Sequence, residues 1–188
     1  MAAQLDGPDA CAQAIAAARA GDPAAFEVLM RRYERLVLVT ALRLLGDLED
    51  AKDASQEVFL RLYRNLGKVE AEGNLQAWLY RVTVNVCHDY GRKRKPSARL
   101  EDVPDLISAV EDPQQSLAGS ERARALRLSL RALSAKEREA LVLRDLEGLS
   151  TEEVARILGS SEATVRSQIS KARVKMRDFV ERYFRRRG

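Results

Sequence analysis

The 188-residue sequence is poor in the residues that mark several common protein classes. Its two cysteines, Cys11 and Cys87, form neither a C-x-x-C pair nor a disulfide framework. Aromatic residues make up 5%, and 10 glycines and 5 prolines are too few for a loop-rich β protein. No run of about 18 apolar residues occurs, and the N-terminus lacks the basic start and apolar core of a signal peptide. We therefore expect a soluble helical protein of a reducing compartment, the cytoplasm, without membrane insertion.

Charge is nearly balanced in number but uneven along the chain. The sequence has 32 basic and 28 acidic residues, for a net charge of +4. Residues 160–188 carry nine bases and three acids, whereas residues 100–119 carry five acids and no base. The order basic, acidic, basic predicts two functional segments separated by an acidic connector.

Helix signals dominate both ends of the chain. Asp22-Pro23 predicts a helix start, and apolar residues spaced by three or four continue to Gly46. Further helices are expected from near Asp50 to Gly67 and from Asn74 to the basic run before Pro96, with a short helix at the N-terminus. Residues 1–95 are thus predicted to form one helical domain.

The acidic connector is predicted over residues 96–118, which hold three of the five prolines. Asp112-Pro113 is expected to open a helix that runs to Leu133. Two capping boxes, Ser134-x-x-Glu137 and Ser150-x-x-Glu153, then predict two short helices, and a last helix follows Gly159. Residues 119–188 form the second predicted domain, so the fold class is all-α: two small helical domains joined by a flexible acidic linker.

The last two helices have the pattern of a helix-turn-helix. If Val165, Ile169, Ala172 and Met176 face the core, the outer face carries hydrogen-bond donors suited to bases and phosphates. A solvated basic surface is the alternative. The net charge of +6 over residues 160–188, directly behind a capped helix pair, favours DNA binding.

Three carboxylates share one face of the predicted helix near residue 50. Asp50, Asp53 and Glu57 are spaced by three and four, with Gln56 beside them. Ordinary solvation is one interpretation, and acid–base or metal chemistry another. No second acidic helix, histidine pair or glycine-rich phosphate loop supports the chemical one, so the row favours a protein partner with a basic groove.

The predicted third helix combines aromatic, amide and basic side chains. Arg81, Asn85, His88 and Arg92 form a polar stripe that leads into the basic run 92–95, with aromatics beside it. This chemistry suits unstacked bases and their backbone. Core packing is at least as good an account of Trp78, and Cys87 and His88 are expected to be structural.

Four blocks occur in a characteristic order. They are DPAAF at 22–26 with Tyr33; DAKDASQEVF at 50–59; AWLYRV at 77–82 with Asn85; and LRDLEGLS at 143–150 through ATVRS at 163–167. Together they cover nearly the whole chain except the N-terminal tail and the linker. The sequence thus resembles the extracytoplasmic-function (ECF) sigma factors, small two-domain members of the bacterial sigma-70 family.

The resemblance implies a role for each block. Core RNA polymerase would be bound by Asp50, Asp53, Gln56 and Glu57, although Lys52 replaces an acid often found in this block. The melted minus-ten element would be held by Trp78, Arg81, Asn85, Arg92, Lys93, Arg94 and Lys95. The duplex minus-thirty-five element would be contacted by Arg144, Thr151, Glu152, Arg166, Ser167, Ser170, Lys171 and Arg173.

The resemblance predicts a transcription initiation factor that directs polymerase to promoters and aids melting, with no enzymatic activity, cofactor or metal. An anti-sigma factor is an expected partner, and the free protein is expected to be a monomer. A decoy that sequesters an anti-sigma factor without binding DNA is the main alternative, and a plain DNA-binding regulator a third. Charge order further suggests that the linker acids limit non-specific DNA binding; they are Glu101, Asp102, Asp105, Glu111 and Asp112.

Overall fold

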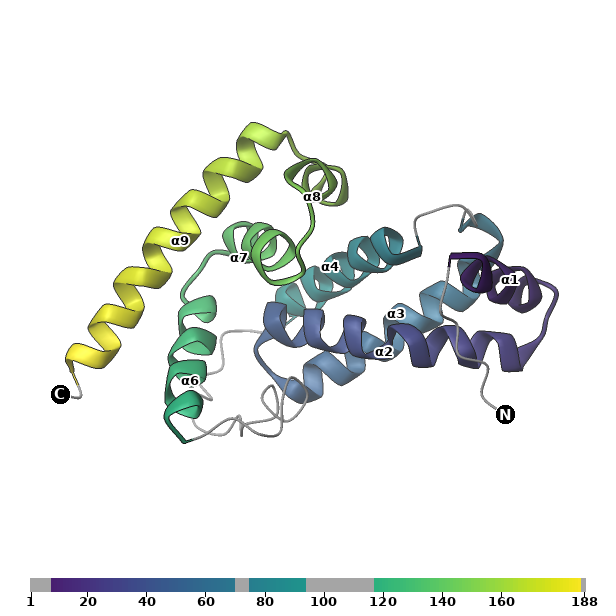
Figure 1. The fold of residues 1–188 in the computed structure, drawn as a ribbon, viewed down its shortest axis with the longest axis horizontal. Helices are drawn as coiled ribbons and strands as arrows, with labels where there is room; N and C mark the ends of the chain where they lie inside the picture. Colours follow the sequence, from purple (N-terminus) through teal and green to yellow (C-terminus); the bar gives the residue numbers. More distant parts are fainter. Residues whose placement is uncertain (1–7, 70–74, 94–116, 187–188) are drawn as a thin grey trace.

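The protein is all-helical wherever its structure is described. The structure is a computed structural model that describes residues 8–69, 75–93 and 117–186. These residues form eight α-helices, one 3₁₀ turn and one π-helical turn, and no strand occurs among them (Figure 1). The predicted all-α class is confirmed.

The described residues of the first half, 8–69 and 75–93, form a helical bundle. Its helices are α1 (Pro8–Arg19), α2 (Pro23–Leu45), α3 (Leu48–Asn65), the 3₁₀ turn η1 (Leu66–Lys68) and α4 (Leu75–Lys93). Helix α2 packs against α1, α3 and α4, and α3 packs against α4. Fully buried side chains from three helices meet in the core: Leu29, Val37, Val58, Leu62 and Leu79. Burial of each such side chain contributes roughly 1.5–3 kcal/mol.

Local capping explains where α2 and α3 begin. Asp22 accepts hydrogen bonds from the backbone N–H groups of Ala24 and Ala25, as its position predicts. Helix α2 stops at Gly46, which has φ +73° in the left-handed region. Helix α3 begins at Leu48, two residues before the predicted start, because the Asp47 carboxylate accepts the Asp50 N–H at 3.1 Å.

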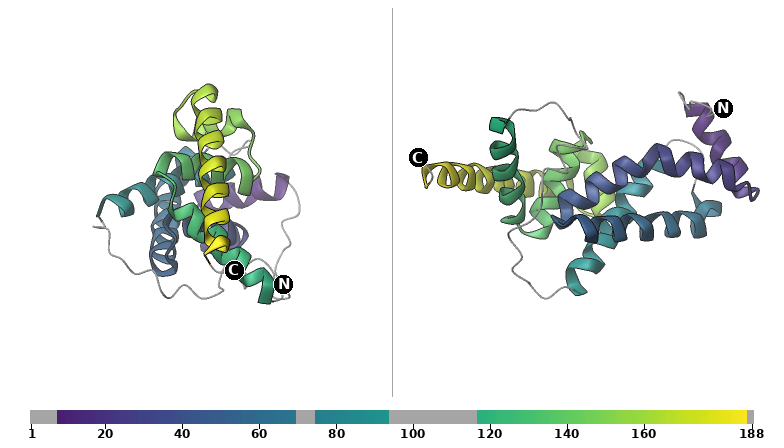
Figure 2. Two further views of the ribbon diagram at one scale, coloured as in Figure 1. Left: turned by 90° about the vertical axis from the view of Figure 1, so that its left-hand side faces the viewer. Right: turned by 90° about the horizontal axis from the view of Figure 1, so that it is seen from below.

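The second half, residues 117–186, is built around one long helix. Its elements are α6 (Leu117–Arg131), α7 (Ala135–Leu141), the π-helical turn η2 (Val142–Leu146), α8 (Thr151–Leu158) and α9 (Glu162–Arg185). Helix α9 packs against α6, α7 and α8, and its C-terminal part extends away from the rest of the molecule (Figures 1 and 2). Both predicted capping boxes, at Ser134 and Ser150, are present.

The two halves pack against each other. Helix α4 contacts α8, and the C-terminal end of α2 contacts α6, α7 and η2. The helix start predicted at Asp112-Pro113 and the linker acids lie outside the described residues. The domain boundaries at residues 95 and 119 stay predictions.

Candidate functional site

The predicted acidic row lies on α3 and faces the end of α4. Asp53 is exposed, whereas Asp50 and Glu57 are half-buried. Glu57 accepts a hydrogen bond from Arg61 at 2.7 Å, and Arg61 also lies 3.5 Å from Asp89 of α4. Arg61 therefore neutralises one end of the row and leaves Asp53 as its exposed charge.

The negative charges of the row affect the pKa of Tyr90 on α4. Burial raises the pKa of Tyr90, and the negative charges of Asp53, Glu57 and Asp50 raise it further. The three predicted carboxylates therefore raise the pKa of the same side chain, as expected for residues that share one face of a helix.

Gln56 lies on a neighbouring side of α3, in a hollow shared with α2. The hollow has a volume of about 570 Å³ and is lined by Phe26, Met30, Phe59, Leu60 and Tyr63 together with Lys52 and Gln56. Leu60 and Tyr63 are 49% and 63% exposed, which is unusual for large apolar side chains outside a contact surface. Phe26 and Tyr63 meet edge to face at 5.2 Å. The predicted partner surface therefore joins an apolar hollow to an acidic row.

On α4 the predicted nucleic-acid residues have different environments. Arg81 and Asn85 are exposed on adjacent turns. Trp78 is half-buried and packs against the hydrophobic core, so part of its surface is structural. Arg92 and Lys93 end the helix, and their side chains are not described; Arg94 and Lys95 lie outside the described residues.

The helix-turn-helix consists of α8 and α9. Val165, Ile169 and Ala172 are buried and Met176 is half-buried, as the spacing predicts. Gly159 ends α8 with φ +59°, and Ser161 caps α9 by accepting the Thr164 N–H at 3.2 Å. The opposite face of α9 exposes Arg166, Ser167, Ser170, Lys171 and Arg173. Glu152 is exposed at the start of α8, while Thr151 and Arg144 are half-buried.

Two of the predicted basic contacts already have acidic partners. Arg166 pairs with Glu162 one turn earlier on α9. Arg173 donates from Nε and Nη2 to the Asp145 carboxylate at 2.8 and 2.7 Å. Lys171 is exposed, whereas Arg173 connects α9 to the π-helical turn.

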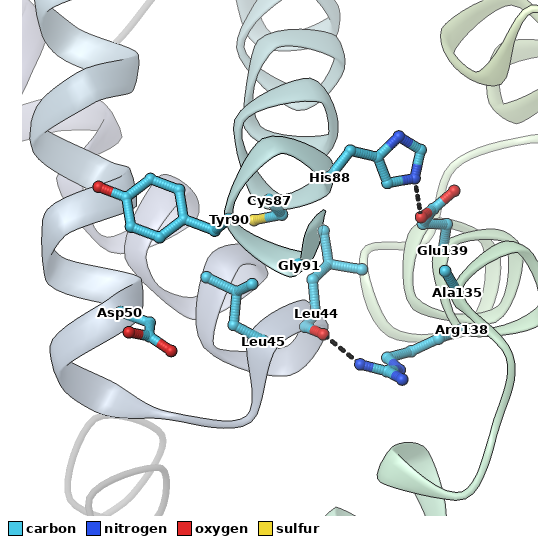
Figure 3. Close-up of a pocket in the computed structure, with 10 residues that line it drawn as sticks. All are labelled: Leu44, Leu45, Asp50, Cys87, His88, Tyr90, Gly91, Ala135, Arg138 and Glu139. Carbon is cyan, nitrogen blue, oxygen red and sulfur yellow. Dashed lines mark hydrogen bonds and ion pairs between the residues drawn. The ribbon is translucent and has the colours of Figure 1, made fainter. Parts of the chain in front are cut away.

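Sequence reasoning missed a cavity between the halves. This cavity of about 510 Å³ lies between the ends of α2 and α4 and the start of α7, with Asp50, Tyr90 and His88 among its lining residues (Figure 3). Across it, His88 hydrogen-bonds Glu139. Burial raises the pKa of Glu139 above its ordinary value, and the interaction with His88 offsets part of this rise. Burial also raises the pKa of Cys87, beside this cavity, to about 12. The signal available in the sequence was the polar stripe that contains His88, but its partner is 51 residues away.

The described part of the chain has neither a metal-ion cluster nor a membrane-spanning helix. It contains no group of three or more His, Cys, Asp and Glu side chains placed to hold a metal ion. None of its helices combines the length and apolar character needed to cross a membrane.

Comparison with known proteins assigns both halves. Residues 29–96 match the family model of sigma-70 region 2, and residues 123–176 match that of sigma-70 region 4. The RNA polymerase sigma-H factor of Pseudomonas aeruginosa is 31% identical over 163 residues, which are 81% of this chain and 84% of that protein. The chain belongs to the ECF sigma factors of the sigma-70 family.

Other relatives of this sigma factor agree. The ECF RNA polymerase sigma factor SigM of Mycobacterium tuberculosis is 35% identical over 88% of this chain and 82% of its own length. The ECF sigma-E factor of Escherichia coli is 30% identical over 88% of this chain and 92% of its own length. The predicted function, a sigma factor of transcription initiation, is confirmed, and sigma factors as a family are non-catalytic.

Solved structures have the same arrangement of helices. The structure of CnrH in complex with the cytosolic domain of CnrY has a TM-score of 0.67 and 27% identity, covering 91% of this chain and 97% of CnrH. The fold is also similar to RpoE of Bartonella quintana, solved with the anti-sigma factor NepR, with a TM-score of 0.70, 23% identity and coverage of 83% and 96%. The roles of individual residues in this sigma factor stay predictions.

Proposed function

We propose that this sigma factor acts in the cytoplasm, without catalysing a reaction, by binding core RNA polymerase through α3 and promoter DNA through α4 and α9. The observation that carries this proposal is the separation of two exposed surfaces of opposite charge. Asp53 represents the acidic one on α3, and Lys171 the basic one on α9. The start of α9 lies well apart from α3 in two perpendicular views (Figures 1 and 2).

The polymerase-binding surface is the acidic row together with the adjoining apolar hollow. Protein–protein interfaces commonly combine an apolar centre with a polar rim, and the charges of the rim favour one partner over others. Leu60 and Tyr63 supply the apolar part, and Asp53 with Gln56 supplies the polar edge. A partner with basic and apolar groups side by side fits this surface.

The DNA-binding surface is divided between α4 and α9. The exposed face of α9 carries Arg166, Lys171 and two serines, which are short enough to let the helix approach base edges and phosphates. On α4, Arg81 and Asn85 are available for the backbone and an unstacked base, while Trp78 can offer only the part of its ring that is outside the core. We assign α9 to the minus-thirty-five element and α4 to the minus-ten element.

An anti-sigma factor of unknown identity is the proposed regulatory partner. This follows from the similar fold of a sigma factor solved with an anti-sigma factor. We also propose that the free protein is a monomer of two domains, residues 1–95 and 119–188, joined by residues 96–118. A decoy without DNA binding has no use for the exposed bases of α9, so the initiation role is the better account.

Binding of the full-length protein to core polymerase tests the first half of this proposal. Replacing the exposed polar edge in the double variant Asp53→Ala/Gln56→Ala is expected to weaken binding at least about tenfold, because two interface groups are lost. Glu181→Ala is the control, since Glu181 is an exposed acid of α9 and lies outside the proposed polymerase-binding surface. Equal affinities of the double variant and the control would refute the assignment of α3.

A further inference from the structure

Glu147 lies at the centre of the contact between the two halves. Its carboxylate accepts hydrogen bonds from Thr40 Oγ1 at 2.9 Å, Arg43 Nη1 at 2.9 Å and Tyr80 OH at 3.0 Å. The Glu147 and Arg43 side chains are only 10% and 16% exposed. One acid of the second half thus satisfies three donors of the first, on both α2 and α4.

Two arginines of the second half reinforce this contact at the end of α2. Arg138 of α7 donates to the Leu44 carbonyl at 2.5 Å, and Arg131 of α6 donates to the Gly46 carbonyl (Figure 3 shows the first). The last carbonyls of a helix have no partner within it and carry partial negative charge, so cations are favourable there. The second half therefore caps α2.

This closed arrangement is too short to occupy both promoter elements. Asn85 is about 7.5 Å along α4 from Tyr80, and Arg144 and Thr151 lie within at most about 14 Å of chain from Glu147. Because Tyr80 and Glu147 are hydrogen-bonded, the two predicted DNA surfaces begin within roughly 35 Å of each other. Elements named for positions ten and thirty-five are about 25 base pairs apart, roughly 85 Å of duplex.

We propose that Glu147 is a latch that holds free sigma factor in a closed, resting conformation, and that its three hydrogen bonds break when the protein engages a promoter. The link to promoter binding rests on the proposed function, whereas the latch itself does not. In the open form water solvates Arg43, Thr40 and Tyr80. In the closed form without Glu147, Arg43 would keep a largely buried charge without this carboxylate, so loss of Glu147 disfavours closure.

Small-angle X-ray scattering of the full-length protein tests the latch without polymerase or DNA. Glu147→Ala is expected to shift the closed–open equilibrium toward the open form on the order of tenfold or more, because a hydrogen-bonded charged group is lost. The radius of gyration is then expected to rise in proportion to the fraction that opens, up to roughly a third above that of one compact body when two linked bodies predominate. Glu181→Ala, an exposed acid on α9, is the control and should leave the radius unchanged.

A second variant covers the case in which Glu147→Ala does not fold, as judged by circular dichroism. Tyr80→Phe keeps the buried ring and removes only the hydroxyl that donates to Glu147, so it should raise the radius of gyration by a smaller amount. An unchanged radius in every folded variant overturns the latch.

Promoter-dependent transcription separates this proposal from the function it builds on. If the variants open in scattering but neither they nor the wild type supports transcription with core polymerase, the latch stands and the proposed function fails. If transcription is promoter-dependent but the variants stay closed, the function stands and the latch is wrong.

Discussion

Arg173 on α9 and Asp145 in the π-helical turn form a two-pronged ion pair, with donor–acceptor distances of 2.8 and 2.7 Å. The Arg173 side chain is 62% exposed, so the pair lies at the edge of the surface proposed to meet DNA. Because both oxygens of Asp145 are engaged, the pair fixes the π-helical turn η2, which precedes α8, against α9. Arg173 is thereby a structural link as well as a base on the DNA-facing side.

Removal of Arg173 should therefore affect DNA binding less than removal of Lys171. Each phosphate contact contributes about 0.9 to the slope of log affinity against log salt concentration. We expect Lys171→Ala in the holoenzyme to reduce that slope by about 1, and Arg173→Ala to reduce it by less than about half as much. Filter binding to promoter DNA over a range of salt concentrations measures both, and equal reductions would contradict the structural role of Arg173.

The capping box at Ser150 should stabilise the second half. Ser150 Oγ accepts the Glu153 N–H at 3.2 Å, and Glu153 accepts the Ser150 N–H at 2.7 Å. Loss of the hydroxyl in Ser150→Ala is expected to lower the free energy of unfolding by about 1 kcal/mol. Urea denaturation measures this. Ser167→Ala, within α9 and exposed, is the control and should change it by less than about 0.5 kcal/mol.

The ion pair between Glu137 and Lys175 makes stability depend on pH. The hydrogen bond from Lys175, at 2.7 Å, is the largest cause that lowers the pKa of Glu137 below its ordinary value of 4.5, with Ser134 adding to it. As the pH falls, Glu137 is therefore protonated in the unfolded chain before it is protonated in the folded protein. The stabilisation is complete above pH 4.5 and is lost as the pH falls through the lower value of the folded state.

The wild type should therefore have a higher free energy of unfolding than Glu137→Gln near neutral pH, and this difference should shrink as the pH falls. We expect this difference to be about 1 kcal/mol at about pH 6 and close to zero at about pH 3. Urea denaturation at each pH measures it, with Glu181→Gln as an exposed control. A difference that grows toward low pH would show that the Glu137 charge does not stabilise α7 against α9.

Cys87 should resist thiol reagents in the folded protein. Burial raises the pKa of its thiol to about 12, so almost no thiolate exists at neutral pH, and the thiolate is the reactive form. Mass spectrometry after alkylation is expected to find Cys87 unmodified until denaturant is added. Rapid modification of Cys87 in native protein would mean that the cavity beside it opens readily.

Much of this fold could be predicted from sequence because its helix starts are set locally. Asp22, Ser134 and Ser150 each cap a backbone group within three residues, and such signals can be recognised in a short window of sequence. The buried face of α9 follows from its spacing in the same way. Helix α3 begins at Leu48, two residues before the start predicted near Asp50, because Asp47 caps it.

The contact between the halves could not be predicted, because its partners are far apart in sequence. Glu147 belongs to a recognised block, but its bond to Thr40 spans 107 residues and that of Arg131 to Gly46 spans 85. No periodicity relates such positions. For the same reason the sequence predicts Arg173 as a DNA contact but does not reveal its bond to Asp145, 28 residues earlier.

Transcription by core polymerase from a template library with randomised minus-thirty-five and minus-ten elements tests the central claim most directly. We predict transcripts enriched for one pair of elements, formed only when this protein is added. They should be lost with Arg166→Ala/Lys171→Ala and retained with Glu181→Ala, because only the former residues lie on the proposed DNA face. A stable complex with core polymerase that yields no enriched transcripts would contradict the account and favour a decoy.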